Sequence, residues 1–389
     1  MTEVGSEGQR DEQSRFPLPR SGAAERDIDL LLLTGAGASC GFGTQGRTLP
    51  LMGDWAKDIF GHLLKDAPGC VVVTGLTEDM SGPEFERQLG TFLRQRDALR
   101  KFGPLIEPSL QLPGVPPDAV MTGGGVVGWY SAASRQFDRV LEVLANSLYR
   151  LFAAPFVDLR AASSAYGRLL DALEMVPRQS RLVLATTNYD TIGERALTDN
   201  GWLPDWGEVP PQLFDSAVLP IQVNGILDGM PRYVPVLHLH GCVGWYRKDD
   251  HVMPTRASRY DSSFGTPVVV YPDPAKEYDG DVVIAGLWSQ FCVALDRAKR
   301  VLILGHSLND RAVLQEVLRR VRPHSRIAVS ILADAGDGTK FDSSATPLME
   351  LVRTELSQAR IFLLRFGPDF EPDRSSLRTW LLDTEAATL

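Results

Sequence analysis

The sequence is poor in cysteine, in lysine and in long apolar runs. No C-x-x-C pair occurs, which excludes a cysteine-built zinc clip and a dense disulfide framework, and the only cysteines are Cys40, Cys70, Cys242 and Cys292. We therefore expect free thiols in a reducing compartment and no bound metal. Residues 1–26 lack an apolar signal segment, and the apolar runs are far shorter than the ~20 residues of a membrane helix. These absences predict a cytoplasmic protein with no membrane partner.

The charge balance is acidic. The formal net charge is -9, and lysine supplies only seven of the 40 basic residues. This balance disfavours direct nucleic-acid binding, because such binding needs a basic surface along the phosphate backbone. Hydrophobic residues at 44% and charged residues at 23% are typical of a globular protein. A length of 389 residues allows one large domain or two modest ones.

Short apolar runs, each ending in small or polar residues, recur along the chain and are typical of buried parallel strands. They cover residues 28–33, 181–185, 234–239, 301–305, 327–332 and 361–364. Amphipathic helical patterns lie between them, at 84–99, 159–173 and 309–321. Strands that alternate with helices predict an α/β fold with a Rossmann-like, doubly wound, mostly parallel six-stranded sheet.

The rest of the chain divides by composition. Residues 1–27 are polar and predict a disordered N-terminal tail, which leaves residues 28–389 as one domain. The stretch from about 50 to 180 has little strand signal and predicts a helical insertion after the first strand. Within it, residues 103–128 are rich in proline and glycine, a composition typical of a lid, a partner-binding segment or a linker.

Two of the strand-end loops contain polar or glycine residues suited to a nucleotide. Residues 34–39, Thr-Gly-Ala-Gly-Ala-Ser, would let the backbone approach a diphosphate, although the third Rossmann glycine would fall at Cys40 and a simple packing turn explains the loop as well. In Thr186-Thr187-Asn188-Tyr189-Asp190, the polar side chains would face the ligand crevice. The alternative is that Asn188 or Asp190 caps the helix that begins near Thr191.

The other two loops carry histidine and serine. Strand alternation puts His238 and His240 on one face, either toward the crevice or toward the packing side. The pair with Cys242 lacks further metal ligands nearby, which disfavours a metal site. The segment 305–310, Gly-His-Ser-Leu-Asn-Asp, offers donors to a phosphate at a helix start, or is a plain turn that Asn309 or Asp310 caps.

The order of these four motifs along the chain resembles the sirtuin superfamily, over roughly residues 29–365. Residues 83–86, Pro-Glu-Phe-Glu, 269–272, Val-Val-Tyr-Pro, and 305–310 look closest to bacterial sirtuin-like proteins of anti-phage defence. The chain departs from deacylating sirtuins, because residues 44–50 do not match their Gly-Ile-Pro-Asp-Phe-Arg loop and the zinc cysteine pairs are missing. An acyl-lysine substrate therefore has no obvious docking site.

The resemblance implies that residues 28–389 form an NAD-binding catalytic domain. His240 would be the general base, Asn188 would hold the nicotinamide ribose or a water, and Asp190 would bind the carboxamide. Thr187 stands where relatives have glutamine at a ribose contact. The remaining cofactor-binding positions implied are Gly35, Ala36, Gly37 and Ser39 on the diphosphate, Gly305 and Ser307 on the adenosine side, and Asp334 on the adenosine ribose.

The implied activity is an NAD hydrolase that cleaves the nicotinamide–ribose bond to give nicotinamide and ADP-ribose, with NAD as substrate, and depletes NAD in anti-phage defence. An alternative is an NAD- or ADP-ribose-binding module that acts with a partner ATPase. A zinc-less protein deacylase or ADP-ribosyltransferase ranks third. Because unrestrained NAD hydrolysis is toxic, we expect restraint by homo-oligomerisation, by the 103–128 segment, or by a partner ATPase or other defence protein.

Overall fold

The computed structural model describes most of the predicted folded part of the chain. The described residues are 28–44, 49, 52–66, 68, 70, 74–110, 126–152, 157–177, 179–206, 232–248, 251–254, 262–273, 278, 281–321, 326–332, 361–366 and 373–382. The predicted tail at 1–27 and Asp334 lie outside them. The assignment of one tail and one catalytic domain stays a prediction.

The main element is a parallel sheet of seven strands in the order β10-β9-β8-β1-β2-β4-β3. Its strands are β1 (Leu30–Thr34), β2 (Leu182–Thr186), β3 (Trp202–Asp205), β4 (Arg232–His238), β8 (Arg300–Leu304), β9 (Arg326–Leu332) and β10 (Ile361–Phe366). All six predicted strands are present, and the α/β, doubly wound class is confirmed. The seventh strand, β3, is a four-residue edge strand that pairs with β4. Without β3, the order is that of a dinucleotide-binding sheet, in which the strand order reverses between β1 and β8.

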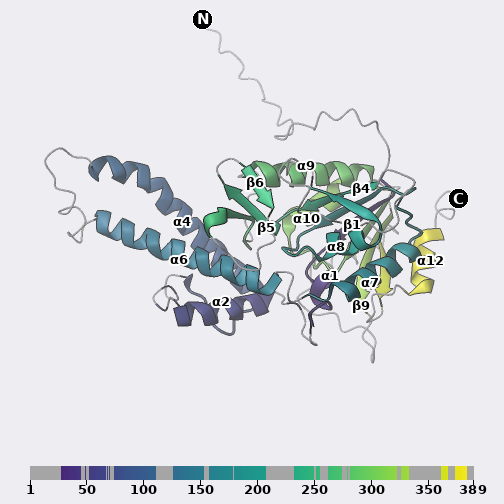
Figure 1. The fold of residues 1–389 in the computed structure, drawn as a ribbon, viewed down its shortest axis with the longest axis horizontal. Helices are drawn as coiled ribbons and strands as arrows, with labels where there is room; N and C mark the ends of the chain where they lie inside the picture. The colour runs from purple at the N-terminus through teal and green to yellow at the C-terminus, as the bar shows by residue number, and fades with distance from the viewer. Residues whose placement is uncertain are drawn as a thin grey trace, which may run out of the picture.

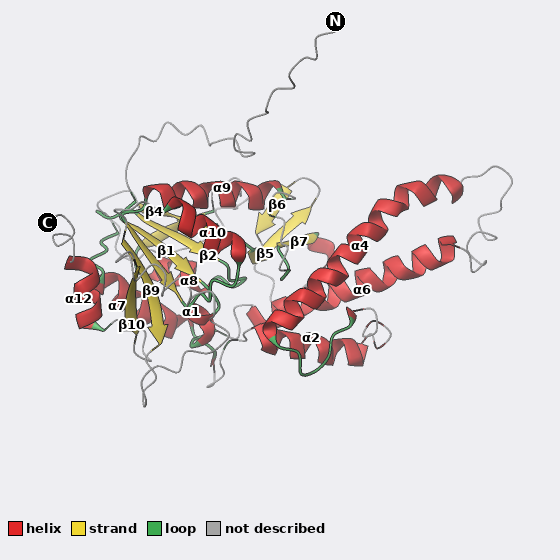
Figure 2. Cartoon of the chain, turned by 180° about the vertical axis from the view of Figure 1, so that it is seen from behind, coloured by secondary structure: helices red, strands yellow, loops and turns green. Residues whose placement is uncertain are grey.

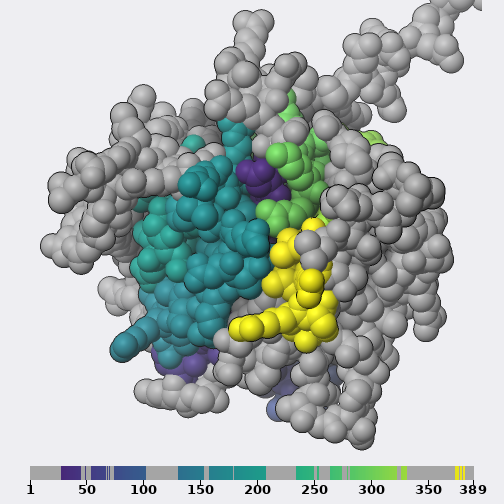
Figure 3. Space-filling view, turned by 90° about the vertical axis from the view of Figure 1, so that its right-hand side faces the viewer, coloured from purple at the N-terminus to yellow at the C-terminus, as the bar shows by residue number. Residues whose placement is uncertain are grey.

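Both faces of this sheet are covered, which explains why its central strands β1 and β2 are buried along their whole length. Alternate residues point to opposite faces: Leu31 and Leu33 belong to a core with α9 (Val282–Arg297) and α10 (Arg311–Arg320), whereas Leu30 and Leu32 belong to a core on the other face. That second core includes α7 (Leu159–Ala172), α8 (Ile192–Asp199) and α12 (Arg374–Leu382). Figure 2 shows the helices flanking the sheet, and in Figure 3 α12 (yellow) lies beside the teal part of the chain that holds α7 and α8.

A separate group of helices projects from the sheet between β1 and β2 in the sequence. It contains α2 (Met52–Asp66), α4 (Gly82–Leu110) and α6 (Val126–Phe152), and α4 and α6 form a long hairpin at one side of the molecule (Figure 1). The three helices share an apolar core of their own, which includes Trp55, Phe85 and Leu144. None of the helices in the described ranges is long and apolar enough to cross a bilayer.

The proline- and glycine-rich segment predicted at 103–128 is shorter than expected. Helix α4 continues to Leu110 and α6 begins at Val126, so residues 103–110 and 126–128 are helical. An interior proline removes one hydrogen bond and kinks a helix, and it does not always end it. Residues 111–125 lie outside the described part of the chain.

A small antiparallel sheet follows β4 and was not predicted. It has the order β6-β5-β7 and comprises β5 (Gly241–Lys248), β6 (His251–Pro254) and β7 (Thr266–Val269). Gly241 has a φ of +76°, and a Cβ there would lie 2.0 Å from the carbonyl oxygen of Val268. Only glycine fits this turn. Val243 and Tyr246 of β5 contribute to the core of α2, α4 and α6, so the small sheet joins the helices to the main sheet.

Candidate functional site

A cavity of about 550 Å³ opens where the loops after β1, β2, β4 and β8 meet. Its volume falls in the usual range for small-molecule sites, and its place at the carboxyl ends of strands, beside the point where strand order reverses, is where ligands bind in doubly wound folds. The predicted site residues that line it are Gly35, Ala36, Gly37, Ser39, Thr187, Asn188, Asp190, His240, Gly305 and Ser307. Every predicted position except Asp334, which is not described, therefore lies around one cavity.

The floor of the cavity consists of backbone packed on backbone. The N–H of Gly35 donates to Leu304 O at 3.0 Å, and the N–H of Gly37 donates to Gly305 O at 2.9 Å. Gly305 has a φ of +59°, and a Cβ there would lie 2.1 Å from the nitrogen of Ala38. The one-turn helix α1 (Gly37–Cys40) thus begins at a turn in which the N–H groups of Gly35 and Gly37 are already bonded within the fold, so these two glycines contribute shape to the site.

A chain of hydrogen bonds joins the loops after β1 and β2. Both amide hydrogens of Asn188 are used, because its Nδ2 lies 3.0 Å from Gly35 O and 2.9 Å from Ser39 Oγ. The Asn188 side-chain oxygen is therefore the atom that could accept a hydrogen bond from a water or a ribose hydroxyl. Ser39 in turn hydrogen-bonds Asp190. Asn188, Ser39 and Asp190 are all less than 10% exposed.

Asp190 lines the cavity and also caps the start of helix α8, which was the alternative interpretation of its place in the sequence. Its Oδ1 accepts from the N–H of Ile192, the first residue of α8, at 2.9 Å. Burial raises the pKa of this carboxyl, and the hydrogen bonds from Ile192 and Ser39 only partly oppose that effect. A buried carboxyl that retains its proton to higher pH could donate to an amide oxygen, which suits a carboxamide ligand.

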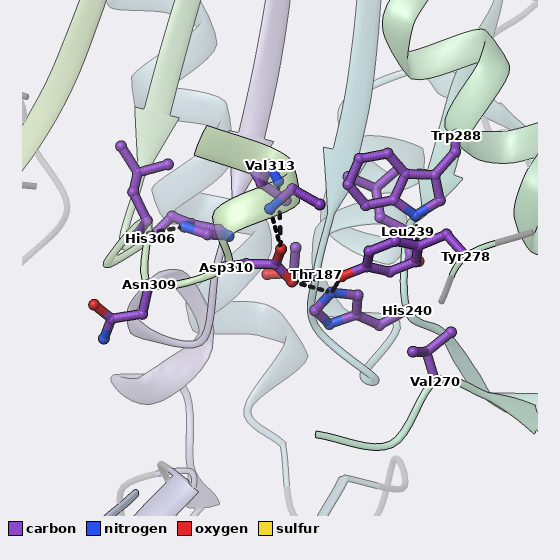
Figure 4. A network of polar contacts seen from close by, with 12 residues as sticks. Thr187, Leu239, His240, Val270, Tyr278, Trp288, His306, Asn309, Asp310 and Val313 are labelled. Carbon is purple, nitrogen blue, oxygen red and sulfur yellow. Dashed lines mark hydrogen bonds and ion pairs between the residues drawn. The ribbon is translucent and has the colours of Figure 1, made fainter. Parts of the chain in front are cut away.

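His240 lies in a second buried cluster, shown in Figure 4. Its Nε2 is 2.9 Å from Oδ2 of Asp310 and 3.2 Å from the hydroxyl of Tyr278. The Tyr278 hydroxyl also donates to Oδ2 of Asp310 at 2.6 Å, and the Tyr278 ring stacks on the imidazole with an interplanar angle of 12°. Burial and the neighbouring Asp310 raise the pKa of Tyr278, so its hydroxyl stays protonated.

The two histidines of the His-x-His pair do not share an environment, contrary to the expectation of one face. Strand β4 ends at His238, whose Nε2 lies 3.0 Å from Oε2 of Glu194 on α8, and whose Nδ1 is 3.4 Å from Asn188 O. The Trp206 indole donates to the same Glu194 oxygen at 2.7 Å. His238 therefore lies beneath the loop after β2, whereas His240 lies beyond the strand end, in the cavity.

Sequence reasoning missed part of the cavity wall. The sequence indicates Asp310 only as a helix cap and gives no signal for Tyr278, because partners so distant along the chain cannot be paired from local patterns. Ser81, Pro83 and Glu86 at the start of α4 also line the cavity, as do Trp55 of α2 and Phe152 of α6. Two motifs of the sequence point to this wall: Pro-Glu-Phe-Glu at 83–86, and Val-Val-Tyr-Pro at 269–272, whose Pro272 also lines the cavity.

No group of three or more histidine, cysteine or acidic side chains that could hold a metal occurs among the residues for which the structure gives positions. The four cysteines are free thiols. Burial raises the pKa of each of them, and only a thiolate is a strong ligand or nucleophile.

The chain is similar in structure to Sir2 homologue complexes, and part of it matches a family model in sequence. A Sir2 homologue mutant in complex with 2'-O-acetyl ADP ribose is similar at 13% identity, covering 85% of this chain and 93% of that chain, with a TM-score of 0.35. A Sir2 homolog–NAD complex is similar at 13% identity, covering 85% and 91%, with a TM-score of 0.33. No curated protein matches the chain significantly. Residues 182–347, which begin at β2 and include the loops of Asn188, His240 and Gly305, match the family model of the SIR2-like domain, and this match supports a relationship with the sirtuin superfamily.

Proposed function

We propose that the chain is an NAD hydrolase, which cleaves the nicotinamide–ribose bond with water as the acceptor. The observation that supports this most is the convergence, around one cavity, of the glycine turn at 35–37, the Asn188–Asp190 loop, His240 and the 305–310 loop. The SIR2-like match over residues 182–347 covers three of those four segments.

In the proposed reaction each polar side chain has one role. Asp190 orients the carboxamide of the leaving group, and the side-chain oxygen of Asn188 accepts a hydrogen bond from the attacking water. The bond between the ribose carbon and the pyridinium nitrogen breaks, and nicotinamide leaves as a neutral molecule with the electron pair. Water oxygen bonds to the same carbon, and its proton passes to His240 and then to solvent. One NAD and one water thus give nicotinamide, ADP-ribose and a proton.

The test is direct measurement of nicotinamide and ADP-ribose released from NAD by the purified full-length chain, with the products separated by chromatography. His240→Ala and Asn188→Ala should each lower turnover at least ~100-fold if these side chains have the roles described. Tight NAD binding without nicotinamide release would instead favour a binding module that acts with a partner ATPase. Undiminished turnover in either variant would assign the chemistry to other residues.

We further propose that the activity depletes cellular NAD in anti-phage defence, on the basis of the motif resemblance. Because such an enzyme must be restrained at rest, a homo-oligomer or a partner protein would control access to the cavity. Cells that express the chain should lose NAD after phage challenge, whereas cells that express His240→Ala should keep it. Equal NAD levels in both would argue against this role.

A further inference from the structure

We propose that Asp310 is a positioning residue of this site: its carboxylate holds the ring of His240 and determines which ring nitrogen carries the proton. The inference rests on the proposed hydrolase and adds a residue that the motif resemblance does not assign. The two carboxylate oxygens of Asp310 have different hydrogen-bond partners. Oδ1 accepts from the N–H groups of Ala312 and Val313 at 3.1 and 3.3 Å, and Oδ2 lies 2.9 Å from Nε2 of His240.

The cap fixes the carboxylate in space and favours its charge. Asp310 is the N-cap of α10, where the positive end of the helix dipole stabilises an anion. The side chains of Asp310 and His240 are each only 8% exposed, so water cannot readily replace either partner. The position of the imidazole is therefore set by where α10 begins.

The hydrogen bonds to Oδ2 determine the tautomer of His240. An ionised carboxylate only accepts hydrogen bonds, so Nε2 of His240 must carry a hydrogen to donate to it. The protonated Tyr278 hydroxyl donates its single hydrogen to the same Oδ2 atom at 2.6 Å. Its oxygen can therefore only accept a hydrogen bond from Nε2 of His240. In the neutral ring, Nδ1 is then the nitrogen that can accept a proton from water or a ribose hydroxyl.

Other groups also face this part of the cavity. The Tyr189 ring centroid lies 6.3 Å from that of His240, and Glu86, Asp190 and His306 line the same cavity. Asp310 differs from these because it bonds the imidazole directly. A change confined to its Oδ2 atom therefore acts on the two groups that bond this atom, His240 and Tyr278.

The decisive variant is Asp310→Asn. Asparagine is among the best N-caps, so its oxygen can keep the bonds to Ala312 and Val313 while its NH₂ group replaces Oδ2. An NH₂ group donates, so Nε2 of His240 would have to accept and the ring proton would move to Nδ1. Loss of the base nitrogen should lower turnover by about 10²–10⁴-fold with little change in KM, as the same substitution does in serine proteases through the wrong tautomer.

A matched control exists on the preceding helix, α9. Asp281 caps α9 in the same manner, with Oδ1 2.9 Å from Val283 N and Oδ2 2.6 Å from Arg247, but it does not line the cavity. Asp281→Asn makes the same chemical change at a helix start and breaks a contact to a charged partner. Its turnover should stay near that of the unchanged protein, which separates the effect on His240 from a general effect of altered caps.

The tautomer is measured by ¹⁵N NMR of full-length protein labelled at histidine, with the His240 signal identified by its loss in His240→Gln. We expect a proton on Nε2 in the unchanged protein and on Nδ1 in Asp310→Asn. This readout needs no turnover, so a protein that never releases nicotinamide would defeat the hydrolase proposal and still test Asp310. A proton on Nδ1 in the unchanged protein would overturn the inference, even if Asp310→Asn did not fold. An unchanged tautomer and turnover in the variant would overturn it too.

Discussion

The hydroxyl of Tyr189 donates to the carbonyl oxygen of Val270 at 2.7 Å, and this bond ties the loop after β2 to the segment after β7. The Tyr189 ring also packs against Trp55 and Phe152, with centroids 5.8 and 6.0 Å apart. Because Tyr189 stands between Asn188 and Asp190, the loop that carries these two site residues is anchored in the core of α2, α4 and α6.

The first prediction concerns that anchor. Tyr189→Phe keeps the ring contacts and removes the hydrogen bond, which should lower the free energy of unfolding by about 1 kcal/mol. Turnover should fall much less than in Asn188→Ala, because the loop is loosened while its polar groups remain. Urea denaturation and nicotinamide release check the two effects, and a Tyr189→Phe protein as inactive as Asn188→Ala would give the hydroxyl a direct role.

The second prediction tests the backbone floor. Gly305→Ala puts a methyl group 2.1 Å from Ala38 N at a positive φ, so the turn must move. We expect a loss of more than about 2 kcal/mol in stability. Gly41→Ala is the control, because φ there is -75° and no atom lies within 4 Å of the added carbon. Thermal unfolding should show it unchanged or slightly stabilised, and equal melting temperatures for the two variants would contradict the floor geometry.

The third prediction follows from the raised pKa of Asp190. A carboxyl with a higher pKa in the folded state binds more protons there than in the unfolded chain, so its contribution to stability falls as pH rises above about 4. Asp190→Asn keeps an acceptor for Ile192 N and removes this dependence. The stability of Asp190→Asn relative to the unchanged protein should therefore be higher at pH 7 than at pH 4, as measured by urea denaturation at both pH values.

The pKa of Asp29 is shifted in the opposite direction to that of Asp190, so Asp29 serves as the comparison in the same experiment. Burial tends to raise its pKa, but the hydrogen bonds from Arg181 N–H and Lys299 outweigh burial and lower it. Its contribution to stability is present at neutral pH and lost as pH falls below about 4. Asp29→Asn should consequently be less stable relative to the unchanged protein at pH 7 than at pH 4. The same sign for both variants would refute the assigned pKa directions.

The fourth prediction separates the two histidines. His238→Ala leaves Glu194 buried without its ring partner, which should cost about 3–5 kcal/mol. Replacing both residues in His238→Leu/Glu194→Leu should recover part of that loss, since no buried charge remains. Denaturation curves of the single and double variants test this coupling. A single variant as stable as the double one would mean that loss of the ring leaves no penalty at Glu194.

Much of the fold was predictable because buried parallel strands are short, apolar and bounded by small residues, as β1 and β8 are. The cavity could be placed because the carboxyl ends of such strands meet at one edge. The edge strand β3 escaped notice because its four residues include Pro204 and only Trp202 is buried.

The partner of His240 could not be predicted from local patterns. Asp310 is 70 residues away in sequence, and its cap role already accounted for its presence before a helix. The alternation of side chains along a strand also gave a wrong prediction. It placed His238 and His240 on one face, although β4 ends at His238. Where a strand ends is decided by its neighbours in the sheet, which the sequence of that strand does not contain.

The glycine floor has a thermodynamic consequence for any ligand. Gly35, Gly37 and Gly305 have no rotatable side chains, and the backbone hydrogen bonds from Gly35 N to Leu304 O and from Gly37 N to Gly305 O hold them in one arrangement before a ligand arrives. A ligand that binds against these glycines restricts no side-chain torsion of the protein there. The conformational entropy lost at this contact is therefore the ligand's own. Affinity on this side of the cavity should therefore depend on the shape and stiffness of the ligand more than on adjustment by the protein.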